Sequence, residues 1–284
     1  MQVIKQASDM HTLVQALRCS GKTIGFVPTM GALHQGHLAL LRASAQDNDV
    51  TVCSIFVNPT QFNNPDDYDL YPRTLEQDIE LLHSVACDYL FAPNKEEVYP
   101  QQSLLQFSFG PLEAVMEGEH RPGHFHGVAT IVSKLFHLVQ PHRAYFGQKD
   151  LQQYAIINQL VQGLSFNLEL VRYPIVREPD GLAMSSRNKR LDAVQRQQAT
   201  SLYKALQLAK EQLGKKPLYT IKATVEAYLA SIAQVQLEYF EVANPDTLQP
   251  LAQTENAGEV ALCIAAFVGP VRLIDNLLVN LNEA

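Results

Sequence analysis

Apolar and polar positions along the first two thirds of the chain alternate between short extended runs and longer stretches of helical spacing. Runs typical of buried strands occupy 23–27, 50–57, 89–91 and 168–171, and another ends at 145–146. Helical spacing occupies 36–45, 74–85, 127–139 and 151–161. Strands separated by helices imply right-handed crossovers. The pattern therefore predicts an α/β fold, a doubly wound (Rossmann-like) parallel sheet with helices on both faces.

The pattern changes after Val176. Two long helical segments, 194–213 and 218–232, are followed by three runs of strand character at 237–242, 260–267 and 271–273. Helices followed by consecutive strands predict a second, smaller α+β domain. We place the Rossmann-like domain at 1–176 and the small C-terminal domain at 177–284, with the segment MSSRN near the start of the latter.

Polar segments follow several predicted strands. Ligands of open α/β sheets bind outside the carboxyl ends of the strands, so the loops after Val27, Val57 and Phe146 are expected to meet in one crevice. In the first loop, PTMGALHQGH, His34 and His37 lie on either side of Gly36 where a helix begins. A helix N-terminus has free N–H groups and a partial positive charge. The loop therefore predicts an anion site, and the alternative is a plain strand-to-helix turn with two surface histidines.

Two further loops carry amides and a lysine. FVNPTQF places Asn58 and Gln61 past a strand, where neutral amides suit a hydroxy-carboxylate, although the turn at Pro59 would also explain the segment. YFGQKD places Lys149 where it can contact a phosphate and Asp150 where it can cap the next helix. The alternative for Lys149 is a solvated side chain.

Two other segments are rich in groups that bind anions or metals. MSSRN combines Ser185 and Ser186 with Arg187, whose guanidinium can hold phosphate oxygens in bidentate fashion, and the alternative is an ordinary surface loop. EHRPGHFHG has three histidines within seven residues, but it lacks a helical histidine pair or a cysteine partner. Its Pro-Gly interior predicts a loop over the active site rather than a zinc site.

Composition and charge narrow the class of protein. The chain has 284 residues, of which 46% are hydrophobic and 18% charged, as in an ordinary globular protein. A net charge of −7 argues against binding of nucleic acid, which needs clustered Lys and Arg. A small anionic substrate needs only a local basic pocket, so ATP is compatible with this charge.

Cysteines and apolar runs predict the cellular environment. The four cysteines form no CxxC pair, and the N-terminus lacks the charged-then-apolar pattern of a signal peptide, which favours a reducing compartment. The longest apolar stretch, 261–268, is too short to span a bilayer. We therefore expect a cytoplasmic protein without a membrane role.

In chain order, the segments PTMGALHQGH, FVNPTQF, DYDLYPRT, RPGHFHGV, YFGQKDLQQ and REPDGLAMSSRN closely resemble the pantothenate synthetase family of the HxGH nucleotidyltransferase superfamily. The resemblance covers nearly the whole chain. It implies an ATP-dependent ligase that joins (R)-pantoate and β-alanine, through pantoyl adenylate, into pantothenate, AMP and pyrophosphate in coenzyme A biosynthesis. It further implies Mg²⁺ with ATP as co-substrate, no organic cofactor, and a homodimer.

The resemblance also implies site residues. His37, His34 and Lys149 are implied as catalytic, and spacing does not decide which histidine donates a proton. Gln61 is similar to the residue that contacts both pantoate and β-alanine, Gln153 is similar to a second pantoate contact, and Asp78 is a candidate for holding Mg²⁺. We also expect Asn58 to contact pantoate. The residues expected to contact ATP are Met30, Gly31, Ala32, Leu33, His34, Gln35, Gly36, His37, Gly147, Gln148, Lys149, Asp150, Val176, Met184, Ser185, Ser186 and Arg187.

One difference from the superfamily concerns charge. The synthetase-type KMSKS loop supplies lysines, whereas AMSSRN has none before Arg187, so Lys149 and Arg187 would supply most of the positive charge around the phosphates.

Three rival functions make different demands on the sequence. An enzyme that transfers AMP to a phosphorylated acceptor needs a second basic pocket, which FVNPTQF does not offer. The chain is short and acidic for a tRNA synthetase. A non-catalytic adenine-nucleotide sensor would release no pyrophosphate.

Overall fold

The computed structural model describes residues 1–63, 68–253 and 258–282. Its larger part is a six-stranded sheet in which every pairing is parallel. The neighbouring strands, in order across the sheet, are β1 (Gln2–Ile4), β4 (Tyr89–Phe91), β3 (Val50–Ile55), β2 (Ile24–Thr29), β5 (Arg143–Gly147) and β6 (Glu169–Tyr173).

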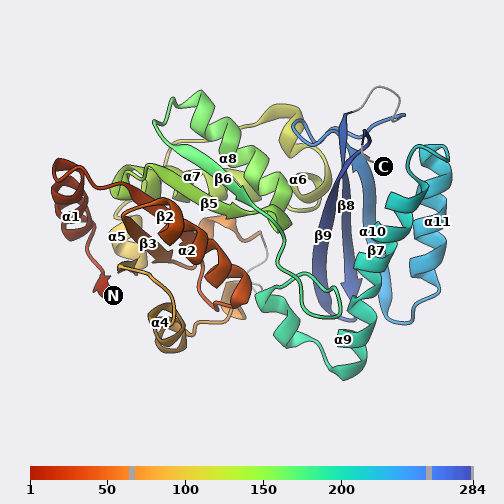
Figure 1. Ribbon diagram of the computed structural model, residues 1–284, viewed down its shortest axis with the longest axis horizontal. Coiled ribbons are helices and arrows are strands. Elements are labelled where there is room, and N and C mark those ends of the chain that lie inside the picture. Colours follow the sequence, from red (N-terminus) through yellow and green to blue (C-terminus); the bar gives the residue numbers. More distant parts are fainter. Residues whose placement is uncertain (64–67, 254–257, 283–284) are drawn as a thin grey trace.

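Helices cover both faces of this sheet (Figure 1). One face packs against α1 (Ala7–Cys19), α7 (His124–Val139) and α8 (Leu151–Gly163), and the other packs against α2 (Gln35–Asp47) and α4 (Leu75–His83). Side chains alternate between the two cores, as with Phe26 and Val27 of β2, because successive residues of a strand point to opposite faces. The predicted doubly wound fold is confirmed.

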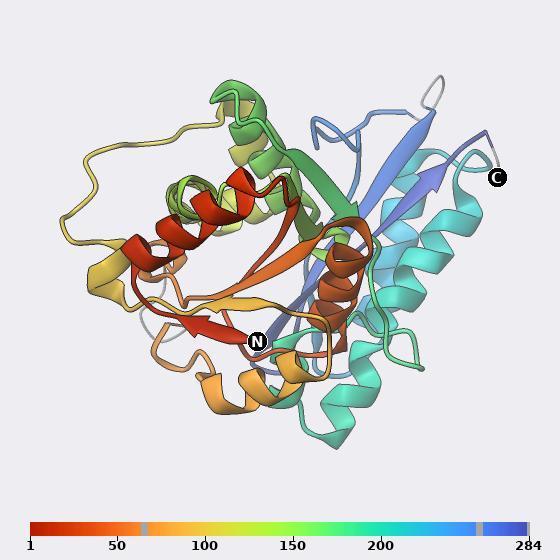
Figure 2. The same cartoon turned by 60° about the vertical axis from the view of Figure 1, so that its left-hand side comes forward.

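A smaller antiparallel sheet follows, built from β7 (Val235–Ala243), β8 (Glu259–Val268) and β9 (Val271–Asn280). α10 (Ser201–Gln212) and α11 (Leu218–Ala230) cover its outer face, where Val260, Leu262 and Ile264 of β8 are buried (Figure 1, Figure 2). Ala261 and Cys263 point to the opposite face, against Ala155 and Ile156 of α8. α8 therefore lies between the two sheets and joins their cores.

Shorter elements complete the described chain. They are α5 (Lys95–Val98), α6 (Met116–His120), α9 (Ala193–Ala199) and 3₁₀ turns at Pro59–Gln61, Gly110–Glu113, Gln148–Asp150 and Ser186–Arg190. In the parts of the chain that the structure describes, no helix is long and apolar enough to cross a membrane.

Several predicted element bounds were wrong. The helix expected at 194–213 is broken at Thr200, whose hydroxyl donates to the Gln197 carbonyl, and α10 starts afresh at Ser201. The strand expected at 271–273 continues to Asn280. The short strand β1 and helix α1 were not predicted at all.

The expected loop EHRPGHFHG is largely helical. α6 ends at His120 and α7 begins at His124, so only 121–123 connect them, with Gly123 in the left-handed region at φ 79°. The motif DYDLYPRT begins at Asp67, which lies outside the described residues, while its remainder is described.

The strand order places a switch point beside β2. The chain passes from β2 to β3 on one side of the sheet, and β5 later pairs with β2 on the other side. Ligands of doubly wound sheets bind in the crevice at such a point, outside the carboxyl ends of the strands.

Candidate active site

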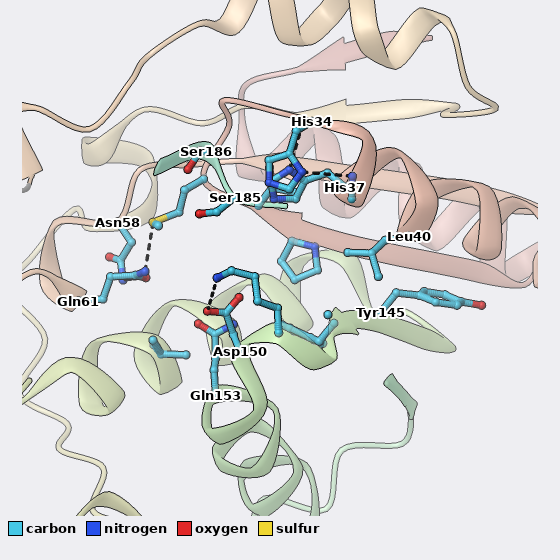
Figure 3. A pocket seen from close by; sticks show the side chains of 18 of the residues that line it. His34, His37, Leu40, Asn58, Gln61, Tyr145, Asp150, Gln153, Ser185 and Ser186 are labelled. Carbon is cyan, nitrogen blue, oxygen red and sulfur yellow. Dashed lines mark hydrogen bonds and ion pairs between the residues drawn. The ribbon is translucent and has the colours of Figure 1, made fainter. Parts of the chain in front are cut away.

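A pocket of about 240 Å³ opens at this switch point. Its lining includes the segments that follow β2, β3 and β5, as the strand pattern predicted, and also residues 173–176 and 184–187. Figure 3 shows His34 and His37 on one side of the pocket, Asp150 and Gln153 on the opposite side, and Gln61 at one end.

Most of the residues proposed from the sequence line this pocket. They are Met30, His34, Gly36, His37, Asn58, Gln61, Gly147, Lys149, Asp150, Gln153, Val176, Met184, Ser185, Ser186 and Arg187. The structure does not bring six others into the lining, namely Gly31, Ala32, Leu33, Gln35, Gln148 and Asp78. A ligand can still meet the backbone of such residues, so the ATP contacts of the first five and the metal-binding role of Asp78 remain predictions.

The start of α2 fixes the hydrogen position on both histidines. His34 is the N-cap, and its Nδ1 accepts from the Gly36 N–H at 3.2 Å. Nδ1 of His37 accepts from the His34 N–H at 3.4 Å, a long bond that completes a capping box. Because both Nδ1 atoms accept, the hydrogen of each neutral ring lies on Nε2. Each ring therefore offers an Nε2–H donor in the pocket that it lines.

Both imidazoles are neutral in the folded protein. Burial, followed by the neighbouring His37 and Lys149, lowers the pKa of His34 to about 3. Burial and then Lys149 lower the pKa of His37 to about 4. Because Lys149 lowers the pKa of both histidines, its ammonium group acts on both rings.

His124 is a third buried neutral histidine, at the first turn of α7. Its Nδ1 lies 2.8 Å from the Gln61 carbonyl oxygen, which can only accept, so Nδ1 carries the hydrogen. Nε2 then accepts from Arg121 at 3.2 Å. Burial and the charge of Arg121 lower the pKa of His124 to about 4. His124 thus fixes the backbone beside Gln61 and the guanidinium of Arg121.

These three histidines should make stability depend on pH. In the unfolded chain each takes up a proton near pH 6.5, but in the folded protein only near pH 3 to 4. The unfolded chain binds more protons within this window, so the free energy of unfolding should fall as the pH drops below 6.5. The slope should approach about 1.4 kcal/mol per pH unit for each histidine.

Urea unfolding followed by circular dichroism between pH 5 and 8 would measure this slope while most carboxylates stay ionised. The His34→Gln variant should show a shallower slope than the wild type. A stability that stays level between pH 7 and pH 5 would contradict the neutral, buried state of these rings.

Asp78 of α4 holds the loop between β2 and α2. Its side chain is 1% exposed, and its two oxygens accept from the N–H groups of Ala32 at 2.9 Å and Leu33 at 2.7 Å. Gly31 and Ala32 have φ angles of 83° and 50°, in the left-handed region, which the two hydrogen bonds help to maintain. Asp78 would have to release these bonds before it could ligate a metal ion.

Asn58 holds Gln61. Its Nδ2 donates to Gln61 Oε1 at 3.0 Å and to the Gly127 carbonyl at 3.1 Å, while its Oδ1 accepts from the Tyr99 hydroxyl at 2.8 Å. Gln61 Nε2 in turn lies 3.1 Å from Met30 Sδ, a weak acceptor that a better ligand oxygen can replace (Figure 3). Gln61 therefore retains a donor for a ligand, whereas the amide of Asn58 is already satisfied.

Gly127 allows this segment to lie against α7. A Cβ at this position would overlap the Thr60 carbonyl and approach the Cα of Gln61. The backbones of α7 and of the 3₁₀ turn that carries Gln61 are thus in direct contact, and only glycine leaves room for this contact.

Cationic side chains also line the pocket. Lys149 lies in the turn after β5, with its side chain 17% exposed and its Nζ 3.6 Å from Asp150 Oδ1. Arg187 belongs to the 3₁₀ turn capped by Ser185, whose Oγ accepts from the Arg187 N–H at 3.3 Å. Together with the N-terminus of α2, these groups favour an anion such as a polyphosphate.

Further polar residues of the pocket lining had no site role predicted from the sequence, among them Tyr71, Arg121 and His124. Tyr71 belongs to DYDLYPRT, which was quoted for the resemblance, whereas Arg121 and His124 belong to EHRPGHFHG, which was predicted as a loop over the active site. Their position in those motifs was the available signal.

The histidines of EHRPGHFHG have separate partners. The ring of His120 stacks on Tyr239 with 5.6 Å between centroids, and His126 Nδ1 accepts from the Phe107 N–H at 3.1 Å, whereas His124 contacts Gln61. Among the described residues, no group of three or more His, Cys, Asp or Glu side chains is arranged to hold a metal ion.

A parallel sheet with a pocket at its switch point, a helix N-terminus and cations around that pocket define a doubly wound protein with a site suited to an anionic ligand. Comparison with known proteins identifies the family. The family model described as pantoate-beta-alanine ligase matches residues 2–278, and the chain belongs to this family.

Individual relatives agree. The pantothenate synthetase of Bacteroides fragilis is 48% identical over 277 residues, 98% of either chain. That of Caldicellulosiruptor bescii is 48% identical over 282 residues, 99% of either chain. The crystal structure of pantothenate synthetase from Thermus thermophilus has a TM-score of 0.91 and 42% identity, over 98% of this chain and 99% of that one.

A further solved structure is pantoate-beta-alanine ligase from Francisella tularensis, complexed with beta-gamma ATP and beta-alanine. It has a TM-score of 0.81 and 37% identity, over 98% of this chain and 97% of that one. The family predicted from the sequence motifs is confirmed.

Proposed function

We propose that this chain condenses (R)-pantoate with β-alanine at the expense of ATP, giving pantothenate, AMP and pyrophosphate. One observation carries the proposal. A single pocket combines the N-terminus of α2, two neutral histidine donors and Lys149 with the side chain amide of Gln61. The helix N-terminus, the histidine donors and Lys149 suit a polyphosphate, and the amide of Gln61 suits a small hydroxy-acid. Membership of the ligase family supports both substrates.

The first step forms pantoyl adenylate. A carboxylate oxygen of pantoate attacks the α-phosphorus of ATP, and the bond from this phosphorus to the pyrophosphate oxygen breaks. Negative charge grows on the leaving pyrophosphate, where Lys149, Arg187 and the serines of MSSRN can stabilise it. His34 and His37 are neutral and carry their hydrogen on Nε2, so they contribute donated hydrogen bonds rather than transferred protons.

The second step forms the amide. The unprotonated amine of β-alanine attacks the carbonyl carbon of the adenylate, AMP leaves with the electron pair of the broken C–O bond, and the amine loses a proton. Gln61 and Gln153 line the pocket where two small reactants must meet, and positioning alone can supply a large part of the rate enhancement.

Mg²⁺ is proposed to enter with ATP. Among the described residues that line the pocket, Asp150 is the carboxylate present. Mg²⁺ is often bound through one or two carboxylates together with substrate phosphates, so this donor set fits a magnesium ion carried by the phosphates. When bound there, the ion would neutralise part of the phosphate charge. Asp150 would then hold both the ion and the ammonium group of Lys149.

Three further properties belong to this proposal. We infer a division into domains 1–176 and 177–284, because β6 ends at Tyr173 and all strands of the second sheet come later. We infer a homodimer from the family resemblance, which sedimentation equilibrium would test. A cytoplasmic location rests on the four cysteines, none of which forms a disulfide, and fractionation of cells would test it.

The decisive experiment follows pyrophosphate release from Mg-ATP and (R)-pantoate, with and without β-alanine, while mass spectrometry follows AMP and pantothenate. We expect sustained turnover with β-alanine and a burst of about one equivalent per site without it, because the adenylate stays bound. No pyrophosphate under either condition would refute the ligase and favour a nucleotide sensor. Pyrophosphate without pantothenate would favour transfer of AMP to another acceptor.

A further inference from the structure

The second sheet is hydrogen-bonded to segments near the pocket through two adjacent buried polar residues of β9, Asp275 and Asn276. Neither lines the 240 Å³ pocket, and neither does any other described residue of β7 to β9. Both side chains nevertheless form hydrogen bonds with segments that do line it. A buried polar group costs stability unless it is fully hydrogen-bonded, so this pair calls for an explanation.

Asn276 is bonded to the turn that carries Lys149. Its Nδ2 donates to the carbonyls of Gln148 at 3.0 Å and Lys149 at 2.9 Å, and its Oδ1 accepts from Gln148 Nε2 at 3.1 Å. The side chain is 2% exposed, and both amide hydrogens and the amide oxygen are used. Two consecutive carbonyls held by one amide fix the backbone from which the Lys149 side chain extends.

Asp275 and Arg177 hold Asn276 in turn. Asp275 Oδ1 accepts from the Asn276 N–H at 2.8 Å. Arg177 donates to both carboxylate oxygens of Asp275, at 2.7 and 3.0 Å, and to the Asn276 carbonyl at 3.2 Å. Its guanidinium also lies over the ring of Tyr203, 3.8 Å from the centroid. The geometry is that of a strong bidentate pair.

Arg177 also fixes the start of the segment that leads to MSSRN. It donates to the Gly181 carbonyl at 3.0 Å, its backbone forms an antiparallel bridge with Ala183, and the Met184 N–H donates to the Val176 carbonyl at 3.0 Å. One hydrogen-bonded unit, Arg177–Asp275–Asn276, therefore connects the Gln148–Lys149 turn with the segment that ends in Met184.

We propose that Asn276, held by Asp275 and Arg177, is a positioning residue for adenylate formation. It fixes the backbone of Gln148 and Lys149 and so directs the Lys149 ammonium group toward the phosphates, while the same unit sets the start of the MSSRN segment. This inference rests on the proposed function. It gives the second sheet a part in the first chemical step, although none of its described residues touches the pocket.

The competing explanation is that Asn276 only docks β9 against the larger sheet. The two explanations differ in a double-mutant cycle with Lys149, because a residue that acts through Lys149 loses its effect when the ammonium group is absent. We therefore compare wild type, Asn276→Ala, Lys149→Met and the double variant by the rate of pyrophosphate release in a single turnover with pantoate.

In the background that retains Lys149, we expect Asn276→Ala to slow adenylate formation about 10- to 100-fold, since small displacements of a catalytic group can cost about this much. In the Lys149→Met background the same change should alter the rate less than about 3-fold. Val279→Ala is the matched control, because Val279 is buried in β9 against the outer helices and is absent from the pocket. It should lower thermal stability but leave the rate near that of the wild type.

Equal rate losses from Asn276→Ala in both backgrounds would overturn the proposal, as would an equal loss in Val279→Ala. If Asn276→Ala does not fold, Asn276→Ser keeps one donor and permits the same cycle. Absence of pyrophosphate from the wild type would refute the proposed function and this inference with it. Turnover by the wild type without coupling between Asn276 and Lys149 would refute only the inference.

Discussion

Replacement of Lys149 by methionine should slow the formation of pantoyl adenylate by roughly 10²- to 10³-fold, the usual cost of removing one group that stabilises charge in the transition state. Methionine keeps much of the apolar stem but removes the ammonium group. That group lies in the pocket and lowers the pKa of both His34 and His37. It is therefore well placed to act on the departing pyrophosphate. Rapid-quench measurement of one turnover would isolate this step.

Lys210→Met is the matched control, because it removes the same charge from an exposed residue of α10 that does not line the pocket. It should change the rate of the step by less than about 3-fold, as expected for a screened surface charge. A second readout is the pKa of His37, which should rise in Lys149→Met because one of the causes that lower it is gone. An undiminished rate of adenylate formation in Lys149→Met would refute the catalytic role assigned to Lys149.

The exchange of His37 for asparagine should slow adenylation by roughly 10²- to 10³-fold, whereas exchange for glutamine should cost only about 10-fold. The difference follows from the hydrogen position, since Nδ1 of His37 accepts from the His34 N–H and leaves Nε2–H as the donor. The amide nitrogen of glutamine can reach the place of Nε2 and donate in the same way. The shorter asparagine side chain ends near Nδ1.

Asparagine should in turn preserve the capping box better, because its Oδ1 can accept from the His34 N–H. The two variants are therefore expected to rank in opposite order for thermal stability and for adenylation rate. Calorimetry of each variant beside the single-turnover rates would show this. Equal rate losses in the two variants would mean that the Nε2–H donor does not stabilise the transition state.

The sequence was sufficient for the elements whose signal is local. The strand at 89–91 was predicted with its observed bounds, and after β1 and α1 the order of strands and long helices in the larger sheet follows from hydrophobic periodicity alone. A general rule for parallel sheets correctly predicted that the loops after β2, β3 and β5 meet in one pocket. These successes required no knowledge of which distant residues touch.

Failures occurred where the deciding contacts are distant in sequence. The last strand was predicted to stop at Leu273, but it continues through Asp275 and Asn276, two polar residues in an otherwise apolar run. They are tolerated in a buried strand because they form hydrogen bonds with Arg177 and Lys149. These partners lie 98 and 127 positions away in the sequence. No local pattern contains that information.

The same limit affects the polar residues near the pocket. Asp78 was a candidate for holding Mg²⁺ through the family resemblance, and Asn58 was assigned to the pantoate site, and both roles stay predictions. In the structure, their hydrogen-bonding groups are occupied by the backbone at Ala32 and Leu33 and by Gln61, Gly127 and Tyr99. The sequence shows that a polar group is present, but only the fold shows whether it is free for a ligand.

The bond between β9 and the Lys149 turn also bears on the order in which the protein matures during synthesis. A nascent chain has all six strands of the larger sheet once Tyr173 has left the ribosome, and domains generally fold from the N-terminus onward. Asn276 emerges 127 residues after Lys149. Until then the two carbonyls that it binds have no partner. If Asn276 has the proposed positioning role, a chain that lacks β9 would leave the Lys149 turn unrestrained, and it should consume ATP more slowly than the chain that includes β9.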